Sequence, residues 1–129
     1  MNYNFNIILL GAGDSSVEIV DYILNDKKFN LNKYYLKVFD DNFKNKKYFK
    51  KLNTKISLEK LNKLKSIKDK NIKALITFGT PELRKKYNLY LSKKKIKLFK
   101  FIHSSSQISK SAKISAGSVI CPMCVIGSF

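Results

Sequence analysis

Residues 108–127 read ISKSAKISAGSVICPMCVIG, and this stretch decides the fold of the C-terminal part of the chain. Isoleucine recurs every six residues, at Ile108, Ile114, Ile120 and Ile126. The residue four positions after each of the first three isoleucines is small: Ala112, Ser118 and Cys124. This is the hexapeptide pattern of a left-handed β-helix, in which each six-residue segment forms one face of a triangular coil and its aliphatic residue fills the narrow core.

The period predicts about one coil over residues 108–125, with residues 126 and 127 opening the next. It also predicts that Cys124 packs inside the coil and that Cys121 points outward. Because a solenoid is stabilised by stacking its repeats, one coil cannot bury both of its ends. The pattern is still running at residue 129, so we expect this chain to be the front part of a longer protein, with the β-helix truncated.

A strand, a tight turn and a helix are predicted near the N-terminus. Residues 6–10 form a short apolar run that is followed at once by Gly11-Ala12-Gly13. Ser15 and Glu18 have the spacing of a capping box, which marks the start of a helix.

Further along, strands are predicted at residues 34–39, 72–77 and 96–102, and helices from Ser57 and from Thr80-Pro81. Residues 43–54 are predicted to be a loop with a short strand near Tyr48. The alternation of strands and helices predicts an α/β fold with a Rossmann-like, mostly parallel sheet covered by helices on both faces. We therefore divide the chain into a Rossmann-like substrate-binding domain, residues 1–103, and the start of a β-helix, residues 104–129.

The charge of the chain is strongly positive, with 26 Lys plus Arg against 9 Asp plus Glu and a net charge of +17. A nucleic-acid partner is one explanation. Genome composition is the other, and we favour it because Arg84 is the only arginine and the lysines are spread along the chain. We expect no specific nucleic-acid partner. No apolar run approaches the roughly 20 residues of a membrane span, and no secretory signal is recognisable, so we expect a cytoplasmic protein.

The two cysteines, Cys121 and Cys124, have the spacing of half a zinc knuckle or of a redox pair. No second cysteine pair exists, and the single histidine, His103, is a poor candidate for the missing ligands. The sequence therefore predicts no metal site.

Four short motifs stand in one order ahead of the hexapeptides: ILLGAG at residues 8–13, VFDD at 38–41, ITFG at 76–79 with LRKK at 83–86, and FIHS at 101–104. In this order they resemble the hexapeptide-repeat sugar O- and N-acyltransferases of the NeuD/PglD type, which act in sialic acid modification and bacterial glycan biosynthesis. The resemblance implies that the first domain binds a sugar or nucleotide-sugar substrate. It also implies that the β-helix forms a homotrimer and binds acetyl-CoA as co-substrate between subunits. The catalytic histidine of the family comes from a later coil, so we expect His103 to be structural and this chain to be inactive alone.

The candidate substrate-binding residues lie in the loops that follow three of the predicted strands: Gly11, Ala12, Gly13, Asp14, Ser15, Asp40, Asp41 and Gly79. The glycines would let backbone donors approach a ligand. Asp14 suits the positive end of a helix dipole but would repel a pyrophosphate there. Asp40 and Asp41 fit two roles equally, hydrogen bonding to a ribose or sugar hydroxyl and formation of a turn. Arg84 is expected to lie exposed on its helix.

Two other functions remain open at this point. One is a free-standing nucleotide- or dinucleotide-binding module that uses Gly11, Gly13 and Asp40, although Ser16 stands where the dinucleotide fingerprint has its third glycine. The other is a basic nucleic-acid-binding protein, which predicts tight binding with a steep dependence on salt.

Overall fold

The computed structural model describes residues 2–128; residues 1 and 129, the outer ends of the two predicted domains, lie outside the described part. A five-stranded sheet of order β3-β2-β1-β4-β5 forms the centre of the molecule. Its strands are β1 (Asn6–Leu10), β2 (Leu36–Phe39), β3 (Ser57–Glu59), β4 (Ile72–Ile76) and β5 (Lys97–Leu98). Every neighbouring pair is parallel, which confirms the Rossmann-like α/β fold.

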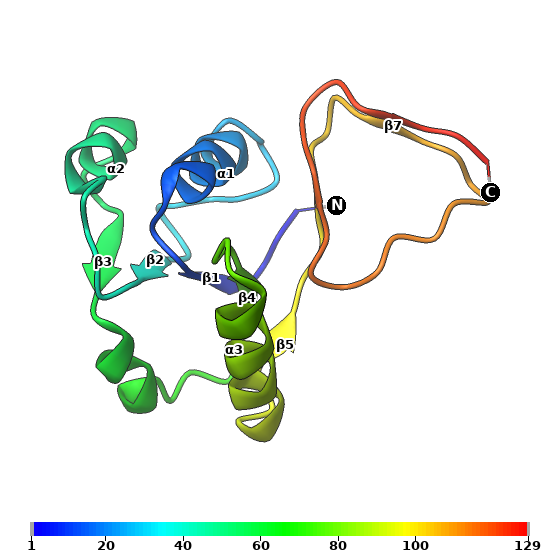
Figure 1. Ribbon diagram of the computed structural model, residues 1–129. Helices are drawn as coiled ribbons and strands as arrows, with labels where there is room; N and C mark the ends of the chain where they lie inside the picture. The colour runs from blue at the N-terminus through cyan, green and yellow to red at the C-terminus, as the bar shows by residue number, and fades with distance from the viewer. Residues whose placement is uncertain (1, 129) are drawn as a thin grey trace.

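Helices cover both faces of this sheet (Figure 1). Helices α1 (Asp14–Leu24) and α2 (Lys46–Leu52) lie on one face, and α3 (Pro81–Lys93) lies on the other with the 3-10 helix η1 (Leu61–Ser66). Successive residues of β1 alternate between the two cores: Ile7 and Leu9 pack on one side, Ile8 and Leu10 on the other. All four are fully buried, which explains why this strand is a continuous apolar run in the sequence.

Two elements between β2 and β4 differ from the prediction. Residues 46–52, predicted to be a loop with a short strand, form α2, which the fully buried Phe49 anchors to the core. Ser57 does not begin a helix; it begins β3, which pairs with β2, and a 3-10 helix follows. Leucines three residues apart, Leu58, Leu61 and Leu64, fit an α-helix, but they also fit a strand that leads into a 3-10 turn. Pairing with β2 decides between the two.

The N-terminal caps of α1 and α3 also differ from the prediction. Helix α1 begins at Asp14 with Gly13 as its N-cap, so Ser15 lies inside the first turn and no capping box forms. Glu18 instead accepts a hydrogen bond of 2.6 Å from the Tyr22 hydroxyl. Helix α3 begins at Pro81 after Thr80, as predicted, but the Thr80 side chain makes no capping hydrogen bond.

The predicted last strand, residues 96–102, divides between two structures. Lys97–Leu98 forms β5 at the edge of the sheet, whereas Phe101–Ile102 forms β6 and pairs with β8 (Val119–Ile120) in the C-terminal part. Phe99, between them, is buried in the core of the sheet. Strand pairing of the C-terminal part therefore begins at Phe101, two residues before the proposed domain boundary.

The C-terminal part follows a triangular path beside the sheet (Figure 1). Strand β6 pairs with β8, and β7 (Gln107–Ile108) pairs with β9 (Val125–Ile126), with partners 18 residues apart in both ladders. Eighteen residues make three six-residue faces, so this is the predicted first coil of a β-helix. Cys124 is half-buried and Cys121 is exposed, as the repeat predicted. Within residues 2–128, no helix has both the length and the apolar character needed to cross a bilayer.

Candidate functional site

The predicted site residues lie at the carboxyl ends of β1, β2 and β4. After β1 the chain builds β2 and β3 on one side, and it then returns to build β4 and β5 on the other. The loops after the adjacent strands β1 and β4 therefore lead in opposite directions and leave a crevice between them. Open α/β sheets bind their ligands in such a crevice. The predicted residues therefore lie at this edge of the sheet, and their binding of a ligand stays a prediction.

Gly11 makes the tight turn after β1. Its φ is +125°, and a Cβ at this position would lie 2.8 Å from the backbone nitrogen of Phe78. Gly13 differs from the expectation, because its φ is −76° and a Cβ added to it would meet no atom within 4 Å. The backbone turn thus depends on Gly11, and the space beside Gly13 and Gly79 is open.

Asp40 and Asp41 stabilise the loops around this turn. One oxygen of Asp40 accepts a hydrogen bond of 2.8 Å from the Ala12 N–H, and the other accepts one of 3.2 Å from the Asn42 N–H. Asp41 accepts a 3.2 Å hydrogen bond from the Leu61 N–H. Both acids therefore make turn contacts. A carboxylate has about four lone-pair positions, so each keeps capacity for a ligand hydroxyl.

Asp14 is held by a residue that the sequence did not single out. The buried side-chain amide of Asn45 donates hydrogen bonds of 2.9 Å to Asp14 and 3.2 Å to the Ala12 carbonyl. Lys44 lies 4.0 Å from the same Asp14 carboxylate, but both groups are exposed and solvent screens the pair. Asn45 stands in a stretch rich in lysine and asparagine, so no sequence signal distinguished it.

A hydroxyl pair joins α1 to the end of β4. The fully buried Ser16 donates a 2.6 Å hydrogen bond to Thr77, whose own hydroxyl lies 3.1 Å from the Leu10 carbonyl and 3.0 Å from the Gly11 carbonyl. A small residue is needed at Ser16 because the helix packs closely on the strand there. Thr77 was not among the predicted site residues.

A cleft of about 720 Å³ opens between this edge of the sheet and the coil. Ser15, Thr77 and Gly79 line it from the sheet side, and residues 117–120 line it from the coil. Neither Asp14 nor the Asp40–Asp41 pair reaches it, so the predicted residues divide between the cleft and the far side of the Gly11 turn. Arg84 also lines the cleft; it is exposed, as expected, and donates hydrogen bonds of 3.3 and 3.2 Å to the carbonyls of Ile76 and Phe78.

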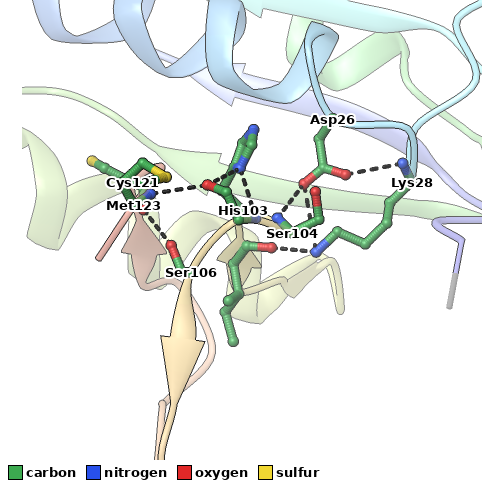
Figure 2. Close-up of polar contacts among 9 residues, drawn as sticks. Asp26, Lys28, His103, Ser104, Ser106, Cys121 and Met123 are labelled. Atoms are coloured by element: carbon green, nitrogen blue, oxygen red, sulfur yellow. Dashed lines mark hydrogen bonds and ion pairs between the residues drawn. The ribbon is translucent and has the colours of Figure 1, made fainter. Parts of the chain in front are cut away.

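The coil is tied to the domain by a buried carboxylate (Figure 2). Asp26, which is 2% exposed, accepts hydrogen bonds of 2.9 Å from the Ser104 N–H and 3.1 Å from the Lys28 N–H. The Lys28 ammonium lies 3.6 Å from the same carboxylate and donates to the Ile102 carbonyl. These contacts fix where the coil leaves the sheet, and so they set one wall of the cleft.

The histidine and the exposed cysteine of the coil, His103 and Cys121, lie in surroundings that do not favour catalysis. The Nδ1 atom of His103 lies 3.1 Å from the Ser105 N–H and 2.8 Å from its hydroxyl, and the ring packs edge-on against Phe101. Burial raises the pKa of the Cys121 thiol, and Cys124 and Glu18 raise it further. A raised pKa disfavours the nucleophilic thiolate. Among the described residues, no group of three His, Cys, Asp or Glu side chains could hold a metal ion.

Comparison with known protein families shows to which family this chain belongs. The family model of the PglD N-terminal domain matches residues 6–91, which include the turn at Gly11, both acids and the end of β4. The chain belongs to the PglD N-terminal domain family. A search of curated protein sequences gave no match.

Solved structures agree with membership in the PglD N-terminal domain family. The acetyltransferase domain of PglB from Neisseria gonorrhoeae, in complex with acetyl coenzyme A, is 20% identical, with a TM-score of 0.70 over 95% of this chain. PerB from Caulobacter crescentus, in complex with CoA and GDP-perosamine, is 13% identical, with a TM-score of 0.66 over 95% of this chain. At these identities the likeness shows the fold. This chain spans about half of each of those chains, 54% in both cases.

Proposed function

We propose that this chain is the substrate-binding part of an acetyl-CoA-dependent sugar acetyltransferase of bacterial glycan biosynthesis. The observation that carries the proposal is the order of its parts: a PglD N-terminal domain runs directly into a hexapeptide coil, and a cleft opens between them. PglB and PerB, whose structures this fold resembles, were solved with acetyl coenzyme A and with CoA and GDP-perosamine, respectively.

The proposed substrate is a nucleotide-linked amino sugar, and the proposed reaction moves an acetyl group from the thioester of acetyl-CoA to the sugar amine or hydroxyl. The accepting group loses a proton as it attacks the thioester carbonyl, so a general base must lie beside it. His103 does not suit this role because the Ser105 N–H donates to its Nδ1 atom, which leaves the proton of the neutral ring on Nε2 and no free lone pair on either nitrogen. The base, most of the acetyl-CoA site and the trimer contacts would belong to later coils of the β-helix.

In this proposal the candidate residues have two roles. Ser15 and Gly79 line the cleft and would contact the sugar side of the substrate, together with Thr77, which was not predicted. The Gly11 turn and the loop after β2 would face the nucleotide side. There Asp40 and Asp41, with the backbone of Ala12 and Gly13, would hydrogen-bond to hydroxyl groups of the nucleotide. Asp14 would disfavour a pyrophosphate at the start of α1, so the phosphates would lie away from that helix end.

Ligand titration of isotope-labelled chain, followed by amide chemical shifts, tests the proposal. Saturable shifts at Ser15, Thr77 and Gly79 with GDP-perosamine or a UDP-linked amino sugar are expected, and NAD should cause none. Saturable NAD binding at Gly11 to Gly13 would instead support the free-standing dinucleotide-binding module.

A glycine substitution makes the test specific. Gly79→Ala adds a methyl group where nothing lies within 4 Å, so the fold should tolerate it while the methyl obstructs a ligand in the cleft. The matched control is Gly127→Ala, which also adds a methyl in open space but lies in the coil outside the cleft residues. Equal affinity in both variants would contradict binding in this cleft.

A further inference from the structure

A second hollow, of about 570 Å³, lies at the opposite edge of the sheet, around the amino ends of β4 and β5. We call it the lysine cleft because lysines make up most of its lining: Lys65, Lys68, Lys70, Lys73, Lys94, Lys95 and Lys97. Asp69 is the only acid among its lining residues. The candidate functional site lies at the carboxyl ends of the strands, so the two hollows do not share a residue.

The charge in the lysine cleft is not neutralised by the chain. The ion pairs found among residues 2–128 are Lys28 with Asp26 and Lys44 with Asp14, and both lie elsewhere. The carboxylate of Asp69 accepts a hydrogen bond from the Tyr35 hydroxyl. Like charges within the Debye length of about 8 Å repel one another at physiological salt, so a bound anion would relieve repulsion among these lysines.

General lysine abundance does not explain this concentration. Both clefts belong to the same chain and the same lysine-rich composition. The cleft at the carboxyl ends is nevertheless lined by one basic residue, Arg84, and no lysine. Attraction to the negative ends of helices accounts for part of the set, because Lys94 follows α3 and Lys65 lies in the last turn of η1. Lys68, Lys70 and Lys73 lie outside helices, so this attraction does not account for them.

Lys95 adds an independent observation from the backbone. It follows α3 with a φ of +58°, in the left-handed region where glycine is the favoured residue after a helix. Its N–H donates 3.1 Å to the Ser92 carbonyl, and the next N–H, of Ile96, donates 2.9 Å to Leu91, so the turn itself is well formed. The chain therefore places a lysine, facing the cleft, where glycine would be more stable.

We propose that the lysine cleft binds a phosphate-rich anion. Lysine can bind phosphate as a compact point charge without a fixed hydrogen-bond geometry, as the lysine of phosphate-binding loops does. Leu64 and Ile72 form an apolar floor, which keeps the ammonium groups at the rim. Clustered phosphates occur in soluble polyphosphates and on anionic phospholipid headgroups, and both sources share the chemistry that the cleft recognises.

Calorimetric titration of the 129-residue chain with tripolyphosphate tests the proposal. The triple variant Lys65→Gln, Lys68→Gln, Lys70→Gln should bind at least about 10-fold more weakly. The control variant Lys46→Gln, Lys47→Gln, Lys51→Gln removes the same charge from exposed positions on α2, and its affinity should change less than about twofold. Equal loss in the two variants, or no saturable binding of any probe, would overturn the proposal.

A second variant guards against misfolding, and a second probe identifies the source of the phosphates. Lys95→Gly should raise the midpoint of denaturant unfolding while weakening tripolyphosphate binding; a higher midpoint with unchanged binding contradicts a role for Lys95.

Sedimentation with phosphatidylglycerol vesicles, compared with phosphatidylcholine vesicles, tests whether the phosphates come from a lipid headgroup. Vesicle binding that the cleft variant loses and the control keeps assigns a lipid headgroup, whereas tripolyphosphate binding without vesicle binding assigns a soluble anion.

Discussion

The carboxylate of Asp26 accepts a 2.9 Å hydrogen bond from the backbone N–H of Ser104, a residue 78 positions later in the chain. This contact joins the end of α1 to the entry of the β-helix coil. The carboxylate is buried and receives the Lys28 N–H as well, so it satisfies two backbone donors at once. This acidic side chain is therefore one of the contacts that hold the coil against the domain.

Asp26→Ala should lower the free energy of unfolding by about 2–4 kcal/mol, because it leaves buried backbone donors and the Lys28 ammonium without their acceptor. Asp21→Ala, which removes a more exposed acid from the last turns of α1, should cost about 0.5 kcal/mol or less. Chemical denaturation measures both variants. Faster amide exchange at residues 101–108 in Asp26→Ala would locate the effect at the coil entry, and similar losses in the two variants would disprove it.

Gly11 and Gly13 should respond differently to the same substitution. Gly11→Ala forces a Cβ to 2.8 Å from Phe78 at a φ of +125°, and we expect a loss of at least about 2 kcal/mol or failure to fold. Gly13→Ala meets no atom within 4 Å and should cost less than about 1 kcal/mol. Thermal unfolding of the two variants checks this ranking, which an equal effect would contradict.

The hydroxyl pair Ser16–Thr77 predicts a measurable coupling. Thr77→Val leaves the buried Ser16 hydroxyl without its acceptor and should cost about 1–3 kcal/mol, whereas Ser16→Ala should cost about 1 kcal/mol. The double variant should lose less than the sum, because it no longer contains an orphaned hydroxyl. A double-mutant cycle from denaturation curves measures the difference, and strict additivity would show that the 2.6 Å contact contributes nothing.

Cys121 should alkylate slowly for an exposed cysteine. Burial, then Cys124 and Glu18, raise the pKa of its thiol, so the thiolate fraction at pH 8 falls below that of an unstructured cysteine. In the Cys124→Ser variant, the rate with iodoacetamide should stay below that of a short cysteine peptide, because burial remains. It should rise as pH increases, with an inflection above that of the peptide. A rate equal to that of the peptide at pH 8 would refute the shift.

The sequence predicted the parts of the fold whose periods follow from geometry. A six-residue repeat in a triangular coil and buried runs in a parallel sheet leave strong patterns, and both structures are present. Helix α2 was not predicted because only Phe49 and Leu52 of its seven residues pack against the core, and two such residues among lysines are too few to establish a period. The prediction of a helix from Ser57 was wrong because Leu58 of β3 stands three residues before Leu61 of the 3-10 helix, and this spacing also fits an α-helix.

The candidate site was predicted only to the level of its loops. The turn at Gly11 and the acids after β2 lie where the motifs placed them. The roles of Asn45 and Thr77 could not be predicted, because each depends on an atom that only the tertiary fold brings near: the Asp14 carboxylate in one case and the Ser16 hydroxyl in the other. The lysine cleft was also invisible in the sequence, since its lysines come from segments some 25 residues apart.

The shared packing of Phe99, Phe101 and Val119 determines how the two parts of the molecule unfold. The two phenylalanines are buried in the same core as the sheet, and Val119 of the coil packs against that core. A boundary drawn near residue 103 therefore cuts through one continuous set of apolar contacts. Heating should unfold both parts in a single cooperative transition, and a domain of this kind could be exchanged between proteins only together with the coil it supports.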